Sequence, residues 1–86
     1  MNEVLIVSFR SRTLVMAFQR ALREKKIVCS VISTPAAIAQ GCGLSVLVNP
    51  VDWGQVRALL KEPRFSGFAG AYLASADGSR IIDKWG

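Results

Sequence analysis

The stretch EVLIVSFRSRTLVMAFQRALREKKIVCSVIS (residues 3–33) decides the fold, because it predicts a strand, a helix and a second strand in succession. Residues 3–9 form a continuous β-branched and aliphatic run, typical of a strand buried on both faces. Ser11 is a suitable N-cap for a helix that runs to about Lys26, and apolar side chains recur at every third or fourth position of that helix. Residues 27–33 predict the second strand.

The middle of the chain continues with short elements. Two pairs of a capping residue and a proline are typical of helix starts: Thr34-Pro35 and Asn49-Pro50. The first pair predicts about one turn of helix over residues 35–40, stopped at Gly41. Residues 44–48 predict a third strand, and the second pair then begins a helix that runs to about Glu62.

The C-terminal part adds more strand. Residues 66–75 predict a fourth strand, and a turn at Asp77-Gly78 leads to a short fifth strand at 80–83. The order β-α-β-β-α-β is that of a ferredoxin-like split βαβ sandwich. We therefore expect an α+β fold with an antiparallel sheet and two main helices on one face. One domain would span residues 1–86, with 75–86 as a candidate C-terminal hairpin extension.

Composition points to anionic partners and a reducing compartment. Eleven Lys and Arg against six Asp and Glu give a net charge of +5, which attracts anions over a distance. Arg and Lys interrupt every apolar run, so no membrane span is expected, and no secretion signal is evident at the start. We expect a cytoplasmic protein whose two cysteines are thiols rather than a disulfide.

The predicted topology brings several polar residues to one edge of the sheet. The end of the first strand and the connection between the second and third strands share that edge, so basic side chains and the start of a helix would meet a Gly-Cys-Gly turn. The candidate site comprises Arg10, Ser11, Arg12, Thr13, Thr34, Pro35, Gly41, Cys42 and Gly43.

Two interpretations of Cys42 remain open on this evidence. Positive charge and a helix N-terminus favour the thiolate form of a cysteine, and glycine neighbours keep it accessible. A free cysteine is equally at home as a small buried hydrophobe. Cys29 lies roughly 15 Å away along the second strand, which is too far for a disulfide, so a core-packing role is expected for it.

Residues 9–46 resemble the selenium/sulfur carrier protein-like family of small bacterial domains. The resemblance rests on a strand ending in Phe9, an amphipathic helix, a second strand that ends before Pro35, and Cys42-Gly43 placed seven residues after that proline. It implies that Cys42 accepts sulfur or selenium as a persulfide-type adduct and relays it. The implied partners are a donor, such as a cysteine desulfurase, and an acceptor protein. A non-enzymatic carrier without a cofactor is expected.

Other classes of function are less favoured. A small-anion-binding or protein-assembly module, including a homodimer, would use the same arginines and helix start without cysteine chemistry. RNA binding is the weakest alternative: RFSGFAGAY (64–72) loosely resembles an RNA-stacking motif, and Phe68 and Tyr72, four residues apart, are expected to share one face of a strand. The chain has no histidine and no paired carboxylates, so neither hydrolysis nor a metal site is expected.

Overall fold

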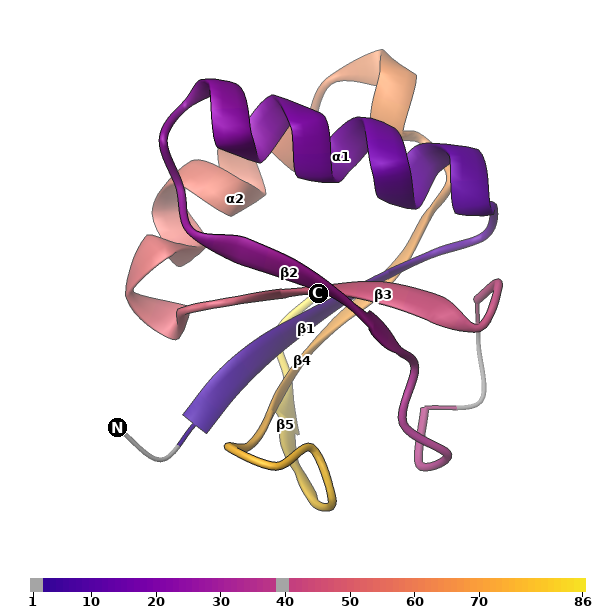
Figure 1. Cartoon of the computed structure of the whole chain (residues 1–86), viewed down its shortest axis with the longest axis vertical. Coiled ribbons are helices and arrows are strands. Elements are labelled where there is room, and N and C mark those ends of the chain that lie inside the picture. Colours follow the sequence, from indigo (N-terminus) through magenta and orange to yellow (C-terminus); the bar gives the residue numbers. More distant parts are fainter. Residues whose placement is uncertain (1–2, 39–40) are drawn as a thin grey trace.

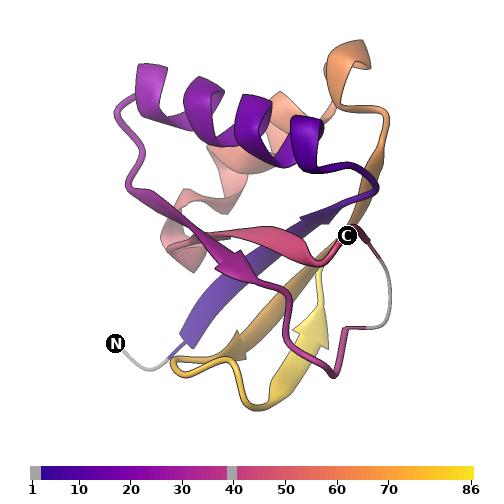
Figure 2. The same ribbon diagram turned by 45° about the vertical axis from the view of Figure 1, so that its right-hand side comes forward.

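The computed structural model describes residues 3–38 and 41–86, which form a five-stranded sheet with both helices on one side (Figures 1 and 2). The strands are β1 (Glu3–Phe9), β2 (Cys29–Ser33), β3 (Leu44–Val48), β4 (Phe68–Ser75) and β5 (Ile81–Lys84). The helices are α1 (Arg12–Glu24) and α2 (Trp53–Leu60), with single 3₁₀ turns at Pro50–Asp52 and Pro63–Phe65. The strand order is β2-β3-β1-β4-β5, with every neighbouring pair antiparallel. The predicted ferredoxin-like fold is confirmed.

The central strand β1 explains why its sequence is apolar without alternation. It pairs with β3 on one side and β4 on the other, and Leu5, Ile6 and Val7 have no solvent exposure. Leu5 and Val7 face the helices, whereas Ile6 faces the opposite side of the sheet. Both faces of β1 are therefore buried.

Helix α1 begins at the predicted cap. The side chain of Ser11 accepts a hydrogen bond from the amide of Leu14 at 3.2 Å. At the other end Lys26 has a left-handed backbone with φ of 61°, and the amide of Ile27 donates to the carbonyl of Leu22. This is the Schellman arrangement, in which glycine is the usual residue at the left-handed position.

Aromatic rings hold the helices against the sheet. Phe18 on α1 lies 5.0 Å from Phe9 and 5.0 Å from Phe65, measured between ring centroids, and all three side chains are fully buried. Val56 and Leu59 of α2 join the same core. The layer between helices and sheet is therefore packed around the end of β1, where the candidate site begins.

No helix forms over residues 35–38, so the prediction of a short helix over residues 35–40 was wrong for this described part. The described part of this segment is a single turn, closed by a hydrogen bond from the amide of Ile38 to the carbonyl of Pro35 at 2.9 Å. Residues 39–40 lie outside the described part of the chain. Ile38 is buried with Ile6 and Ala74 on the face of the sheet away from the helices, and Figure 2 shows the segment that directly follows β2 continuing to that side of the sheet. Burial of Ile38 overrides the local helix signal.

Phe68 and Tyr72 do not share a face, contrary to the prediction. Ser8 pairs with Gly70 but Phe9 pairs with Phe68, so one extra residue bulges out of β4 and shifts its alternation. Phe68 packs on the helix side, 6.1 Å from Phe9 between ring centroids, while Tyr72 packs on the opposite side. The two rings therefore cannot form one surface for stacking bases.

Strand β5 closes the sheet at one edge. It pairs with β4, and the amide of Trp85 continues the pairing by donating to the carbonyl of Ala71 at 2.7 Å. The Trp85 ring lies 5.8 Å from the Trp53 ring of α2, between centroids. Within residues 3–38 and 41–86, no helix has the length and apolar character needed to cross a membrane.

Candidate functional site

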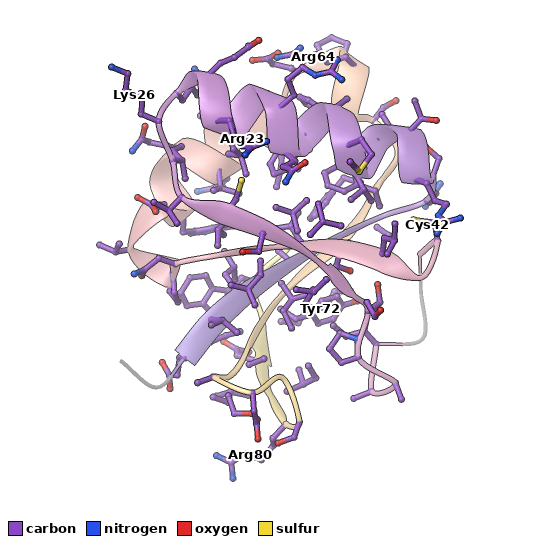
Figure 3. All side chains as sticks on the ribbon, viewed as in Figure 1. Arg23, Lys26, Cys42, Arg64, Tyr72 and Arg80 are labelled. Carbon is purple, nitrogen blue, oxygen red and sulfur yellow. The ribbon has the colours of Figure 1, made fainter. Side chains whose placement is uncertain are left out.

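Cys42 lies on the connection between β2 and β3, against the end of β1. Its amide donates a hydrogen bond to the carbonyl of Phe9 at 3.0 Å. Figure 3 shows Cys42 below the end of α1 at which that helix begins. The predicted convergence of this connection with the β1–α1 junction is thus present in the backbone.

Positions 41 and 43, on either side of Cys42, require glycine for different structural reasons. Both have positive φ values, +110° at Gly41 and +91° at Gly43, a region that side chains other than glycine rarely adopt. A Cβ atom at Gly41 would also collide with the side chain of Ser8 and come within 2.9 Å of the Phe9 carbonyl oxygen. At Gly43 the same atom would meet open space. Gly41 lets the loop approach β1, whereas Gly43 only turns the backbone.

Thr34 ties the two arms of this connection together. Its amide donates to the carbonyl of Gly43 at 2.9 Å, and its hydroxyl lies 2.6 Å from the hydroxyl of Ser45. Its side chain therefore serves the connection and does not cap a helix. Pro35 begins the turn that leads to Ile38. These residues fix the base of the loop.

The Cys42 side chain is half-buried. One side packs against the core between helices and sheet, and the thiol donates a weak hydrogen bond to the carbonyl of Leu44, with a sulfur–oxygen distance of 3.6 Å. A thiolate has no proton to donate, so ionisation would give up this contact. The geometry leaves both interpretations of Cys42 available, because the thiol is neither enclosed nor fully exposed.

The four predicted residues at the start of α1 lie where expected, but they are not bonded to the thiol. The Ser11 hydroxyl serves as the helix cap, and the amide of Arg10 donates to the carbonyl of Gly67 at 2.8 Å. Arg12 and Thr13 occupy the exposed first turn of α1. In the described chain, neither Arg10 nor Arg12 makes a side-chain hydrogen bond or an ion pair with Cys42. Their role in binding stays a prediction.

Sequence reasoning missed three residues that shape the site. The carbonyl of Phe9 holds the Cys42 amide, the carbonyl of Leu44 receives its thiol, and the buried side chain of Ser8 limits the space at Gly41. Two of these contributions come from backbone atoms, which side-chain patterns do not reveal. Ser8 could have been noticed as the polar residue within an otherwise apolar strand.

Cys29 occupies a different environment at the opposite end of β2. Its thiol is 3.9 Å from the carbonyl oxygen of Gln19, and it packs against the core as predicted. Burial raises the pKa of the Cys29 thiol, and the nearby positive charge of Arg23 lowers it in part. Both cysteines are free thiols. Within the described residues, no cluster of three His, Cys, Asp or Glu side chains could hold a metal ion.

Comparison with known families places this geometry in context. A family described as "Putative Se/S carrier protein-like" matches residues 4–66. The chain belongs to this Se/S carrier protein-like family. The family region runs from β1 to just before β4 and so contains Cys42 and all the predicted site residues. No curated protein and no solved structure matched the chain.

Proposed function

We propose that this member of the Se/S carrier protein-like family carries sulfur or selenium on Cys42 and passes it from a donor protein to an acceptor protein. The observation that supports the proposal is the partly exposed Cys42 between two glycines, held at the end of β1 within the family region. Cys29 is the weaker candidate, because burial disfavours its thiolate.

The proposed transfer is a thiol exchange that balances without an external oxidant or reductant. The Cys42 thiolate attacks the outer sulfur of a persulfide on the donor cysteine. A sulfur–sulfur bond to Cys42 forms, the sulfur–sulfur bond of the donor breaks, and the donor cysteine leaves as a thiolate that takes up the proton released by Cys42. Delivery repeats the exchange with Cys42 as the donor. The same steps carry selenium when the outer atom is selenium.

The surroundings of Cys42 suit an adduct whose outer atom is anionic. Arg10 and Arg12 are exposed and lie on the segment that follows the Phe9 carbonyl. Their flexible side chains supply positive charge next to the loop, and the first turn of α1 adds the positive end of the helix dipole. Gly43 has open space where a side chain would begin, so the loop leaves room for a partner.

The test is the mass of the intact protein after incubation with a cysteine desulfurase and its cysteine substrate. Wild type and the Cys29→Ser control should each gain the mass of one sulfur atom, and Cys42→Ser should gain none. Equal loading of Cys42→Ser and wild type would refute the carrier proposal. A small-anion-binding module, the alternative, predicts no sulfur on any variant together with sulfate or phosphate binding that is lost in Arg10→Gln and Arg12→Gln.

A further inference from the structure

Strand β2 is an edge of the sheet with free backbone groups. The Thr34 amide points to the side of β3 and donates a hydrogen bond to the carbonyl of Gly43, the residue before β3. Because backbone groups alternate in direction along an antiparallel pair, the amides and carbonyls of Cys29, Val31 and Ser33 point away from β3. No backbone hydrogen bond from these outward groups occurs within residues 3–38 and 41–86.

This edge lacks the charged residues and prolines that usually prevent strands from pairing. Its sequence, CSVIS, contains no charged residue and no proline, and the preceding Val28 is 84% exposed. Edge strands are normally blunted by charges, prolines or short length. The opposite edge, β5, follows that rule, since it contains Asp83 and Lys84. The two edges of one sheet therefore differ in their capacity to accept a further strand.

Two cavities straddle the beginning of β2, and Val28 and Cys29 line both of them. The first, of about 390 Å³, also contacts Arg23, Lys26 and Ile27. Figure 3 shows Arg23 on the side of α1 above β2, and Lys26 extending from the end of that helix. This cavity lies on the helix side of the strand and is positively charged.

The second cavity, of about 450 Å³, reaches the other face of the sheet. Val4 and Leu47 supply its apolar surface, and Ser30 lies on the same face of β2. Glu3 and Asp52 also line it, together with Asn49 and Val48. Alternate side chains of an added strand point to opposite faces, so successive residues of such a strand would enter the two cavities in turn.

We infer that β2 binds an extended acidic segment of another protein by strand addition. Backbone hydrogen bonds to Cys29, Val31 and Ser33 provide the affinity, and the two cavities select the side chains. An acidic residue faces Arg23 on the helix side, and the next residue lies beside Ser30 on the other face, where the second cavity begins. The occupant is not a second copy through β2, because β2 has no acidic residue to offer Arg23 and each chain carries a net charge of +5.

Binding at β2 requires no chemistry of Cys42, and the two cavities lie at the end of β2 away from Cys42. The docked segment would run along β2 from Cys29 to Ser33, and Thr34 then joins the Cys42 loop through Gly43. A protein held by such a segment would be guided toward that loop. Binding at β2 can be measured without loading sulfur, so each proposal can fail by itself.

The test uses the peptide acetyl-Thr-Val-Glu-Val-Glu-Val-Thr-amide with isotope-labelled full-length protein. We expect nuclear magnetic resonance shifts centred on β2, with slower hydrogen exchange at the outward amides of Cys29, Val31 and Ser33. A peptide with lysine in place of both glutamates should bind more weakly, and one methylated on its central backbone nitrogens should not bind. Arg23→Gln should weaken binding about threefold, the scale of one exposed ion pair. Arg80→Gln, which removes an exposed charge that lines neither of the two cavities, is the matched control.

Three outcomes would overturn the inference. One is binding of the methylated peptide as strongly as the parent peptide, because backbone pairing would then be irrelevant. Another is equal loss of affinity in Arg23→Gln and Arg80→Gln, which would reduce the effect to net charge. The third is protection of the β2 amides that rises with protein concentration and is not displaced by peptide, because a second copy would then occupy the edge.

Discussion

The Cys42 amide donates a hydrogen bond to the Phe9 carbonyl, with a nitrogen–oxygen distance of 3.0 Å. This bond joins the β2–β3 connection to the last residue of the most buried strand. Phe9 itself is fully buried and packs against Phe18 and Phe65. The position of the Cys42 backbone is therefore determined by the core of the protein, although its side chain is half-exposed.

Alanine at the two loop glycines should have unequal effects on stability. Gly41→Ala combines a positive φ with a collision against Ser8 and the Phe9 carbonyl, so we expect a loss of about 3 kcal/mol in the free energy of unfolding. Gly43→Ala has only the positive φ and should lose about 1 kcal/mol. Urea denaturation of both variants measures the difference. Equal losses would mean that the loop does not approach β1 as described.

The two thiols should differ in their reaction with a thiol reagent. At pH 7 we expect Cys29 to react several-fold more slowly than Cys42, because burial raises the Cys29 pKa and leaves less of it as thiolate. Its rate should rise as the pH is raised toward that pKa. Labelling of Cys42→Ser and Cys29→Ser separates the two rates. Equal and slow labelling at pH 7 would contradict the assignment of Cys42 as the reactive cysteine.

Asp77 should make stability depend on pH in the acid range. The amide and hydroxyl of Ser79, with the hydroxyl of Ser75, bond its carboxylate and lower its pKa to about 2 from 3.8. A lowered folded-state pKa gives stability that is present above pH 3.8 and is lost as the pH falls toward 2. Asp77→Asn should therefore be less stable than wild type at pH 7, and the difference should disappear near pH 2. Urea midpoints at both values check this, and a difference independent of pH would contradict it.

Glycine at position 26 should stabilise the protein. Lys26 has a φ of 61°, where a side chain costs about 1 kcal/mol relative to glycine. Lys26→Gly should therefore raise the free energy of unfolding by about 1 kcal/mol. The neighbouring Lys25 has a φ of −88°, so Lys25→Gly removes the same charge without relieving strain and should be neutral or destabilising. Thermal unfolding of the two variants compares them, and a loss of stability in Lys26→Gly would contradict the described helix end.

The fold was predictable because its strongest signals act locally. The apolar run of β1, the Ser11 cap and the stripe of α1 each dictate one element, and few topologies accommodate their order. The failures involve contacts between distant parts of the chain. Ile38 is buried on the face of the sheet away from the helices, so it does not form the helix that its local sequence predicts. The bulge in β4 places Phe68 on the helix side of the sheet.

The candidate site was predictable in its location but not in its contacts. Topology alone brings the Cys42 loop to the end of β1, and the two glycines mark an unusual backbone. The side chains of Arg10 and Arg12 could not be positioned from sequence, because long exposed side chains have many rotamers of similar energy. The carbonyl groups of Phe9 and Leu44 carry no sequence signal, since every residue has one.

The anchoring of the β2–β3 connection limits how a transferred atom could travel. Ile38 is buried beneath the sheet, and four residues later the Cys42 amide donates a hydrogen bond to the Phe9 carbonyl. Carriers that deliver cargo on a long swinging arm move the reactive group between stations, whereas the Cys42 backbone is hydrogen-bonded to the core strand β1. In the proposed transfer, a partner has to bring its own reactive cysteine to Cys42 at the end of β1. The shape of that partner, rather than the motion of this loop, would then decide which proteins can take part.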